Sequence, residues 1–333
     1  MEVSEENLAL IHALQIAPRV SWTDAAEILG SHPTTLATRW DRLRQSGLAW
    51  VTANPISPGM ELSLSFFDIE CTLDRRSAVI DSVCAMPEVV SVVESARNRD
   101  LMLIVQTSSL AVLGQTVVPR LAGIAGVTKY QASMCTRLHA EGHRWRLNVL
   151  DKRQQADLEA LRPRTSQSAA SWPAEYWDVV RILMRDGRAS AADIAKEIGV
   201  HPTTASRRLN NILASDLVSF RCEMAQHYSG YPVSCQWFAN VPAGQHENAA
   251  EALLTFRNLR LCASTTGTTN FTFVMWLRSV ADVMASELAI AERVPAIALV
   301  ESTIALNYPK RVGWLLDTEG RATGEVVVPR LPV

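Results

Sequence analysis

Apolar and polar residues alternate with a helical period in two short segments that lie half a chain apart. The apolar positions are spaced i, i+4, i+7, at Leu36, Trp40 and Leu43 in the first segment and at Ala205, Leu209 and Ile212 in the second. This spacing is typical of a helix that buries one stripe and exposes the opposite face. We therefore predict an amphipathic helix in each segment.

The two segments belong to a longer internal repeat. Residues 30–48 and 199–217 align without a gap at an offset of 169, and both contain His-Pro-Thr-Thr, beginning at His32 and His201. Small and polar residues over 162–173 separate the two copies and have the composition of a linker. The sequence thus predicts two similar halves joined near this stretch.

Each copy carries the start and stop signals of a helix-turn-helix. Residues 21–24 and 190–193 both read Ser-x-x-Asp, a capping box that marks a helix start. Gly30 and Gly199 suit the left-handed position that follows a helix end. A second helix is predicted to begin two residues further on, where proline fits the first turn.

The exposed face of each predicted second helix carries hydroxyl, amide and guanidinium groups, which suit phosphate oxygens and base edges. These residues are Thr34, Thr35, Thr38, Arg39 and Arg42 in copy one, and Thr203, Thr204, Ser206, Arg207, Arg208 and Asn211 in copy two. A solvated amphipathic helix would show a similar face. The recurrence of the whole helix-turn-helix pattern favours DNA binding.

The remainder of each copy predicts an α+β module. Runs 48–52 and 217–221 are interpreted as wing strands. In copy one, strands are then predicted over 62–71, 89–96, 100–107 and 127–138, with helices over 75–86 and 110–122. In copy two, strands are predicted over 233–241, 261–268, 270–278 and 297–308, with helices over 248–259 and 280–293. This strand-helix-strand-strand-helix-strand order is ferredoxin-like. We place Leu101, Leu103, Phe271 and Phe273 on the sheet face opposite the helices, where a partner sheet is expected.

The predicted fold class is α+β, with two winged helix-turn-helix domains and two ferredoxin-like (βαββαβ) domains in an internal duplication. The predicted domains are helix-turn-helix 1–55, sensing domain 60–140, linker 141–174, helix-turn-helix 175–225, sensing domain 230–310 and tail 311–333. Trp145 and Trp314 follow the two sheets. They pack either across the copies or across chains, or on their own sheets.

Composition narrows the class of protein. The net charge is −2, so a DNA interface has to rest on local charge rather than on a basic protein. Six dispersed cysteines without a CxxC pair predict buried thiols, with no metal and no cofactor. An acidic beginning and the lack of a long apolar run predict a cytoplasmic protein without a membrane partner.

The segments over 30–48 and 199–209 resemble the recognition helices of the Lrp/AsnC (feast/famine) family of regulators. They read Gly-x-His-Pro-Thr-Thr-Leu-x-x-Arg-Trp-x-Arg-Leu-x-x-x-Gly-Leu and Gly-Val-His-Pro-Thr-Thr-x-Ser-Arg-Arg-Leu. The family usually has Ser at His32 and His201, and Gly at Asp216. The resemblance implies a regulator that binds double-stranded DNA, responds to an amino acid or related small metabolite, and forms homo-oligomers. The chain then looks like a fused pseudo-dimer for an imperfect palindrome, with half-sites about 34–36 Å or a multiple apart.

The resemblance also implies a ligand-sensing loop between the second and third strands, in which a Gly is commonly followed by an Asp. Copy two keeps the Gly and copy one keeps the Asp. The candidate ligand-binding residues are Gly267, Thr268, Thr269 and Asn270 in copy two, Asn98 and Asp100 in copy one, and Ser302 and Thr303 on the last strand. A plain hairpin turn without a ligand is the alternative.

Two rival functions remain open at this point. Sirohaem decarboxylases resemble the same fold and place His and Arg around a tetrapyrrole. No Tyr-x-Arg-x-His pattern lies on a predicted second or third strand, and no common catalytic motif occurs. We therefore predict that the chain is not an enzyme, with no catalytic residues. A DNA-binding architectural protein that has lost sensing is the third possibility.

Overall fold

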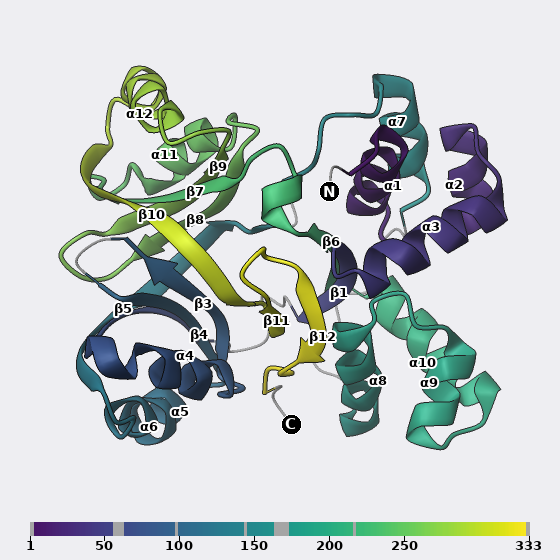
Figure 1. Ribbon diagram of the computed structural model, residues 1–333, viewed down its shortest axis with the longest axis horizontal. Helices are drawn as coiled ribbons and strands as arrows, with labels where there is room; N and C mark the ends of the chain where they lie inside the picture. Colours follow the sequence, from purple (N-terminus) through teal and green to yellow (C-terminus); the bar gives the residue numbers. More distant parts are fainter. Residues whose placement is uncertain are drawn as a thin grey trace. The chain divides into compact units, whose positions relative to one another are not determined.

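A computed structural model describes residues 3–55, 63–96, 99–142, 145–162, 173–215 and 218–330. The chain folds into two compact units, each assembled from two separate stretches of sequence. Met1–Glu61 and Arg146–Ala225 form a helical unit with both helix-turn-helix motifs, and Leu62–Trp145 and Gln226–Arg330 form a sheet unit (Figure 1). Corresponding parts of the two copies therefore fold together.

The helical unit contains two three-helix motifs, each followed by one strand. Its elements are α1 (Glu5–Ile16), α2 (Trp22–Leu29), α3 (Pro33–Gln45), β1 (Ala49–Pro55), α7 (Lys152–Ala160), α8 (Ala174–Arg185), α9 (Ala191–Ile198), α10 (Pro202–Ala214) and β6 (Val218–Met224). The predicted apolar stripes of α3 and α10 are buried. Gly30 and Gly199 end α2 and α9 with φ of 63° and 67°, as predicted. Helix α7 lies inside the stretch that we predicted to be a linker.

The two strands that we interpreted as wings pair with each other instead of with their own motifs. The β1–β6 ladder is antiparallel and runs from Ala49 opposite Met224 to Pro55 opposite Val218. Thr52 faces Arg221, its own equivalent in the repeat, so the ladder is symmetric about this pair. An isolated strand leaves its backbone groups unpaired, and joining the two copies satisfies both strands at once.

Two equivalent arginines link the two copies inside the helical unit. Arg19 donates to the carbonyl oxygens of the residues before and after Arg188. The Arg188 guanidinium in turn donates to the carbonyl oxygens of the residues before and after Arg19, at 2.7 and 2.8 Å. The Arg188 guanidinium also lies 4.0 Å from the centre of the Trp22 ring. Burial lowers the pKa of Arg188 to about 10, so the group remains charged at neutral pH.

The sheet unit contains two ferredoxin-like modules. The first has β2 (Ser63–Cys71), η1 (Leu73–Arg75), α4 (Arg76–Cys84), β3 (Val89–Ser95), β4 (Leu101–Thr107), α5 (Leu110–Val112), η2 (Leu113–Val117), α6 (Val118–Ala122) and β5 (Val127–Ala140). The second has η4 (Gln226–Tyr228), β7 (Val233–Asn240), α11 (His246–Leu253), β8 (Leu259–Thr265), β9 (Phe271–Leu277), α12 (Asp282–Arg293), β10 (Ala298–Arg311), β11 (Trp314–Leu316) and β12 (Ala322–Val326). The strand orders β3-β4-β2-β5 and β8-β9-β7-β10 match the predicted arrangement.

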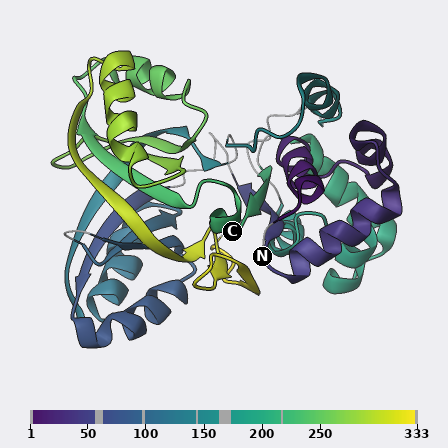
Figure 2. The same ribbon diagram turned by 45° about the horizontal axis from the view of Figure 1, so that its top comes forward.

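The two modules close on each other through their long last strands. The 14-residue β5 pairs with β2 and then with β8, and the 14-residue β10 pairs with β7 and then with β3. Figure 2 shows β10, in yellow, running the length of both modules. Each of the eight module strands thus has two neighbours, which removes exposed sheet edges. The predicted tail adds the β11–β12 hairpin beyond β10.

Our assignment of the two sheet faces was wrong. Leu101, Leu103, Phe271 and Phe273 are buried and belong to the cores beneath the helices, not to the opposite face. Strand β4 has apolar residues at successive positions, so alternation alone does not identify the helix-covered side. The face opposite the helices instead carries polar residues such as Asp68, which alternates with the core residues of β2.

Two predicted helices of the sheet unit differ from expectation. The helix predicted over 248–259 ends at Leu253, because the chain turns there to enter β8. The helix predicted over 110–122 contains a π-helical segment at Leu113–Val117, followed by α6, whose second residue is Pro119. Proline has no N–H to donate, and widening of the preceding turn accommodates the missing bond.

Trp145 packs across the copies, the first of our two alternatives. Its ring centre lies 4.5 Å from that of Trp276 on β9, in an edge-on arrangement. The Arg260 guanidinium lies 4.0 Å from the Trp276 ring centre. A residue that follows the first module thereby contributes to the packing of the second.

Candidate functional sites

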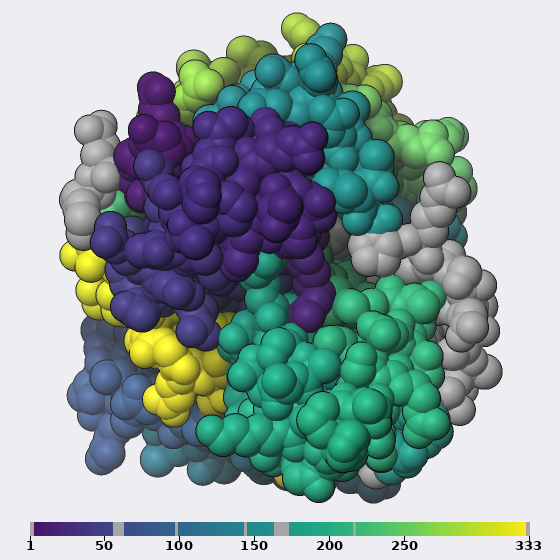
Figure 3. Space-filling model, turned by 90° about the vertical axis from the view of Figure 1, so that its right-hand side faces the viewer, coloured from purple at the N-terminus to yellow at the C-terminus, as the bar shows by residue number. Residues whose placement is uncertain are grey.

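The recognition helices α3 and α10 expose most of the residues that we predicted to contact DNA. Figure 3 shows α1–α3, in purple, beside α8–α10, in teal and green, on one face of the helical unit. The exposed residues are Thr34, Thr35, Thr38, Arg42, Thr203, Arg207 and Asn211, whereas Arg39, Thr204, Ser206 and Arg208 are partly buried. Helix α3 starts with two exposed threonines, and α10 starts with one exposed threonine, Thr203.

Two of the predicted arginines already have acidic neighbours. Arg39 lies 3.4 Å from Glu6 on α1, and its equivalent Arg208 lies 3.9 Å from Glu175 on α8. These contacts join each recognition helix to the first helix of its motif. Arg42 and Arg207 have no ion-pair partner among the residues that the structure describes, so they are the better candidates for contacts with phosphate.

The exposed cation occupies different positions in the two copies. Arg207 of copy two replaces Thr38 of copy one, and Asn211 replaces Arg42. The Asn211 amide donates to the hydroxyl of Tyr176 at 2.9 Å, which fixes its orientation. The two helices therefore present different donor patterns to any surface that they contact.

The two histidines that replace the usual serine stand at the N-caps of α3 and α10. In both copies the Nδ1 atom lies 2.9 Å from the hydroxyl of the second helical residue, Thr34 or Thr203. His201 also accepts the backbone N–H of Thr203 at 3.4 Å, and His32 makes no cap hydrogen bond. The imidazole therefore caps the backbone of α10, whereas in α3 it contacts only the Thr34 hydroxyl.

The candidate sensing loop of copy two is bonded to neighbouring backbone. Gly267 has φ of 117°, and the turn is attached to β5 by hydrogen bonds between Thr266 and Met134. The Asn270 amide accepts from the N–H of Val241 and donates to its carbonyl, both at 2.9 Å. Thr268 and Thr269 complete this turn between β8 and β9.

Asp100 makes the equivalent contact in copy one. Its carboxylate accepts the backbone N–H of Cys71 at 2.7 Å and pairs with Arg76 at 3.3 Å. Asp100 and Asn270 thus both hold the end of the first strand of their module. Asn98 lies outside the described residues. On β10, Thr303 is buried and its hydroxyl lies 2.9 Å from that of Ser95, while Ser302 is partly buried.

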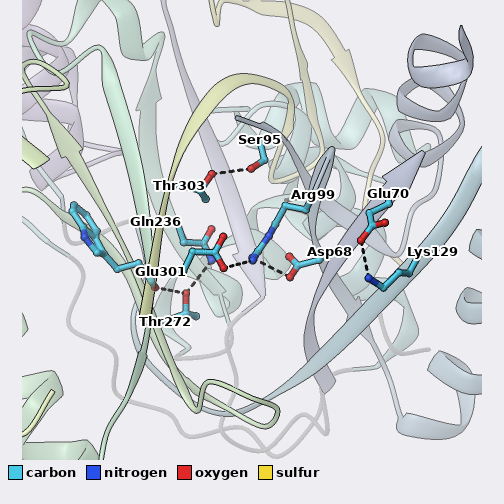
Figure 4. A network of polar contacts seen from close by, with 10 residues as sticks. Asp68, Glu70, Ser95, Arg99, Lys129, Gln236, Thr272, Glu301 and Thr303 are labelled. Atoms are coloured by element: carbon cyan, nitrogen blue, oxygen red, sulfur yellow. Dashed lines mark hydrogen bonds and ion pairs between the residues drawn. The ribbon is translucent and has the colours of Figure 1, made fainter. Parts of the chain in front are cut away.

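A charged network lies on the face of the sheet opposite the helices (Figure 4). The Arg99 guanidinium lies 3.0 Å from Asp68 on β2 and 2.8 Å from Glu301 on β10. Its centre also lies 4.3 Å from the ring centre of Phe238 on β7. Burial raises the pKa of Asp68, against the opposing effect of the Arg99 charge. One arginine thus connects residues of both modules.

A cavity of about 210 Å³ adjoins this network, lined by Asp68, Glu70, Arg99, Lys129 and Gln131. Glu70 pairs with Lys129 at 2.8 Å, and Gln131 lies opposite Asp68 in the β2–β5 ladder. Sequence analysis did not identify these residues, because they become neighbours only through strand pairing and closure of the sheet.

Two histidines that are far apart in the sequence contact one serine hydroxyl. His139 Nε2 on β5 lies 2.8 Å from Ser264 Oγ, and His246 Nδ1 on α11 lies 2.7 Å from it. Glu247 lies 3.7 Å from the other nitrogen of His139. Burial lowers the pKa of His139, although the Glu247 charge acts in the opposite direction. This arrangement can pass a proton between two imidazoles through a hydroxyl.

Copy one has different chemistry at the equivalent place. Arg76 at the start of α4 lies 3.4 Å from Glu94 on β3, and the Asn307 amide donates to Glu94 at 3.0 Å. The ion pair of Arg76 and Glu94 therefore occupies the positions of His246 and Ser264, and Pro309 stands at the position of His139. Our sequence analysis missed the histidine cluster because no spacing relates His139 to His246.

The comparisons with known proteins identify one domain and one full-length fold. Residues 178–211 match the AsnC-type helix-turn-helix domain. No curated protein sequence matches the chain. The siroheme decarboxylase NirDL, solved with an iron-uroporphyrin III analogue, has a similar fold over 93% of each chain, with a TM-score of 0.60 and 13% identity. At this identity the likeness concerns the fold alone.

Two smaller solved proteins match part of the chain. E. coli AsnC aligns over 41% of this chain and 94% of its own, with 15% identity and a TM-score of 0.36. B. subtilis LrpC aligns over 41% of this chain and 96% of its own, with 19% identity and a TM-score of 0.35.

The prediction that the chain is not an enzyme is wrong. It rested on the absence of catalytic motifs, whereas a siroheme decarboxylase, which is an enzyme, has a similar fold over 93% of each chain. Within the described residues, no group of three potential ligands is arranged to hold a metal ion. No helix in the described ranges is both long and apolar enough to cross a bilayer. Function therefore has to be argued from the sites themselves.

Proposed function

We propose that the chain is a sequence-specific DNA-binding regulator of transcription whose two recognition helices act together. The observation that carries the proposal is the joining of both helix-turn-helix motifs in one compact unit by the β1–β6 ladder and the reciprocal contacts of Arg19 and Arg188. The AsnC-type match over 178–211 supports the same conclusion. One chain then provides the two-helix arrangement that a two-part operator requires.

The operator of such a protein has two unlike half-sites. Thr38 and Arg42 of α3 are replaced by Arg207 and Asn211 of α10, so the guanidinium lies about one turn nearer the helix start in copy two. A perfect palindrome would present the same donors and acceptors to both helices and fit only one of them well. The proposed operator is therefore an imperfect palindrome.

The proposed effector is an amino acid or a related small metabolite that binds at the turns between the second and third strands. Gly267 gives the copy-two turn a backbone conformation that other residues rarely adopt, which supports close approach of a ligand to the main chain. Asp100, Ser302 and Thr303 are weaker candidates for this role, since neighbouring protein groups contact Asp100 and Thr303.

Association of chains is part of the same proposal. Met284 and Leu288 lie four residues apart on α12, and Val280 lies in the turn just before this helix; their exposed fractions are 71%, 63% and 61%. Exposed apolar side chains on and beside one helix support burial against another molecule. The proposed partner is a second copy of this chain, and sedimentation over a range of protein concentrations tests it.

The test measures binding of the full chain to a labelled fragment of its own upstream region at several salt concentrations. Each phosphate contact contributes about 0.9 to the slope of log affinity against log salt. We expect the double variant Arg42→Ala, Arg207→Ala to lower that slope by about 1.8 and to weaken binding. Arg153→Ala, an exposed cation on α7, is the matched control and should leave both unchanged. Equal binding to scrambled DNA of the same length would contradict the proposal.

A second function, decarboxylation of a tetrapyrrole, has one observation in its favour beyond the NirDL fold. His139 and His246 share the hydroxyl of Ser264, which provides proton-transfer groups in the sheet unit. The test incubates the protein with siroheme and follows loss of carbon dioxide by mass spectrometry. His246→Ala should abolish turnover, while His227→Ala, an exposed histidine, should not. Absence of turnover in the unmodified protein would exclude this reaction.

A further inference from the structure

The charged residues that line the Arg99 cavity belong to copy one and have no charged equivalents in copy two. Asp68 lies opposite Gln131 in the first module, and Phe238 lies opposite Glu301 at the same place in the second. In the sheet modules the two copies align at an offset of 170, so Arg99 corresponds to Thr269 and Glu70 to Asn240. Copy two therefore has a phenyl ring and neutral side chains at positions where copy one has an arginine and two carboxylates.

Closure of the sheet does not require this charge. The second module pairs its strands in the same way with Phe238 at the position of Asp68. Charged groups that are removed from water lose hydration energy, and their mutual attraction often does no more than offset this loss. Only 11% of the Arg99 side chain is exposed, and for Glu301 the value is 19%. A costly network that occurs at only one of the two equivalent places in the sheet points to a role other than stability.

The cavity and its immediate border carry more negative than positive charge. Three carboxylates (Asp68, Glu70 and Glu301) surround two cations, Arg99 and Lys129. Oε1 of Glu301 is buried and receives no hydrogen bond from the residues that the structure describes. Nη1 of Arg99 is likewise buried without a hydrogen bond among these residues, so the preference for a cation rests on the net charge. A ligand with one positive charge would balance that charge, and its N–H groups would suit the carboxylates that line the cavity.

We infer that this cavity binds a small primary amine, whose ammonium group donates to Asp68, Glu70 and the amide oxygen of Gln131. A primary ammonium has three donors, and the three side chains that carry these acceptors all line the cavity. Arg99 forms a fixed wall, because Phe238 and two carboxylates hold it in place. An apolar cavity of about 150 Å³ accommodates benzene, so 210 Å³ admits an amine with a short carbon chain.

Charge and hydrogen bonding also exclude the nearest alternatives. An anion would meet the excess of carboxylates and bring no donors to them. A divalent cation needs several oxygen ligands converging on one point, and the described residues contain no such group of three. A quaternary ammonium has the charge but no N–H to donate.

The test is isothermal titration calorimetry of the full chain at about pH 7.5, with butylamine, butyrate and tetramethylammonium as separate titrants. Butylamine should saturate one site per chain. Asp68→Asn should weaken its affinity about tenfold or more, because it removes a charge-assisted hydrogen bond. Asp74→Asn changes an exposed carboxylate of the same module and should have no effect. Thermal unfolding confirms that each variant is folded, and Glu70→Gln replaces Asp68→Asn if the latter is not.

Three results would overturn the inference. They are saturable binding of butyrate, equal affinity for tetramethylammonium and butylamine, and no saturable heat with butylamine for the folded protein. The titration contains no DNA, so it can fail or succeed independently of the regulator proposed above.

Discussion

Replacement of His12 should remove a large part of the acid sensitivity of the helical unit. His12 lies on α1 with 1% of its surface exposed, and its Nδ1 accepts the backbone N–H groups of Leu150 at 3.1 Å and Val149 at 3.4 Å. Burial, followed by the charge of Arg146, lowers its pKa to about 4. The imidazole therefore acts as a neutral acceptor that attaches the chain before α7 to α1.

The effect of pH follows from the difference between the folded and unfolded states. The unfolded chain binds the proton with a pKa of 6.5, and the folded chain with a pKa of about 4. The contribution of neutral His12 to stability is therefore complete above 6.5 and is lost progressively as the pH falls to about 4. At about 1.4 kcal/mol for each pH unit, the loss is roughly 3 kcal/mol.

The assay compares urea unfolding of the unmodified chain and His12→Asn between about pH 7.5 and pH 4. Asparagine retains an acceptor near the position of Nδ1 and does not titrate. We expect the stability advantage of the unmodified chain to shrink by roughly 3 kcal/mol over this range. His227→Asn, an exposed histidine, is the control. A constant difference between His12→Asn and the unmodified chain at every pH would refute the reasoning.

Two further substitutions test how the chain is held together. Lys310 on β10 is fully buried and donates to two carbonyls at the end of α4, at 2.8 and 2.9 Å. Lys310→Met should lower the free energy of unfolding by about 2–4 kcal/mol in urea, and a loss no greater than that of the exposed Lys196→Met would contradict this. A Cβ at Gly187 would lie 2.9 Å from the backbone of β1, so Gly187→Ala should cost about 1–3 kcal/mol in thermal unfolding. Gly114→Ala adds its Cβ to open space, and an equal effect there would count against steric conflict.

Local signals in the sequence predicted the individual elements well. The spacing of Leu36, Trp40 and Leu43 predicted the buried stripe of α3, and Gly30 predicted the end of α2. The repeated strand-helix order predicted both ferredoxin-like modules. These features depend on residues within a few positions of one another, which propensity and periodicity describe.

Features that join distant residues were not predicted. Alternation along β4 could not identify its helix-covered side, because adjacent positions are apolar. The histidines that share Ser264 lie on β5 and α11, more than a hundred residues apart. The acidic partners of Arg39 and Arg208 could likewise not be predicted from the sequence, because each glutamate lies on another helix.

The sequence by itself determined the repeat, the two helix-turn-helix motifs and the order of strands and helices in each module, since each depends on local hydrogen bonding and on the burial of nearby apolar residues. Only the tertiary structure decided how the copies combine. Two distant segments have to meet to form the β1–β6 ladder. The same holds for the pairing of β5 and β10 with strands of the other module, and for the charged network around Arg99. Such contacts arise when unpaired strands and buried charges find partners across the whole chain, and no short pattern of residues specifies which partners these are.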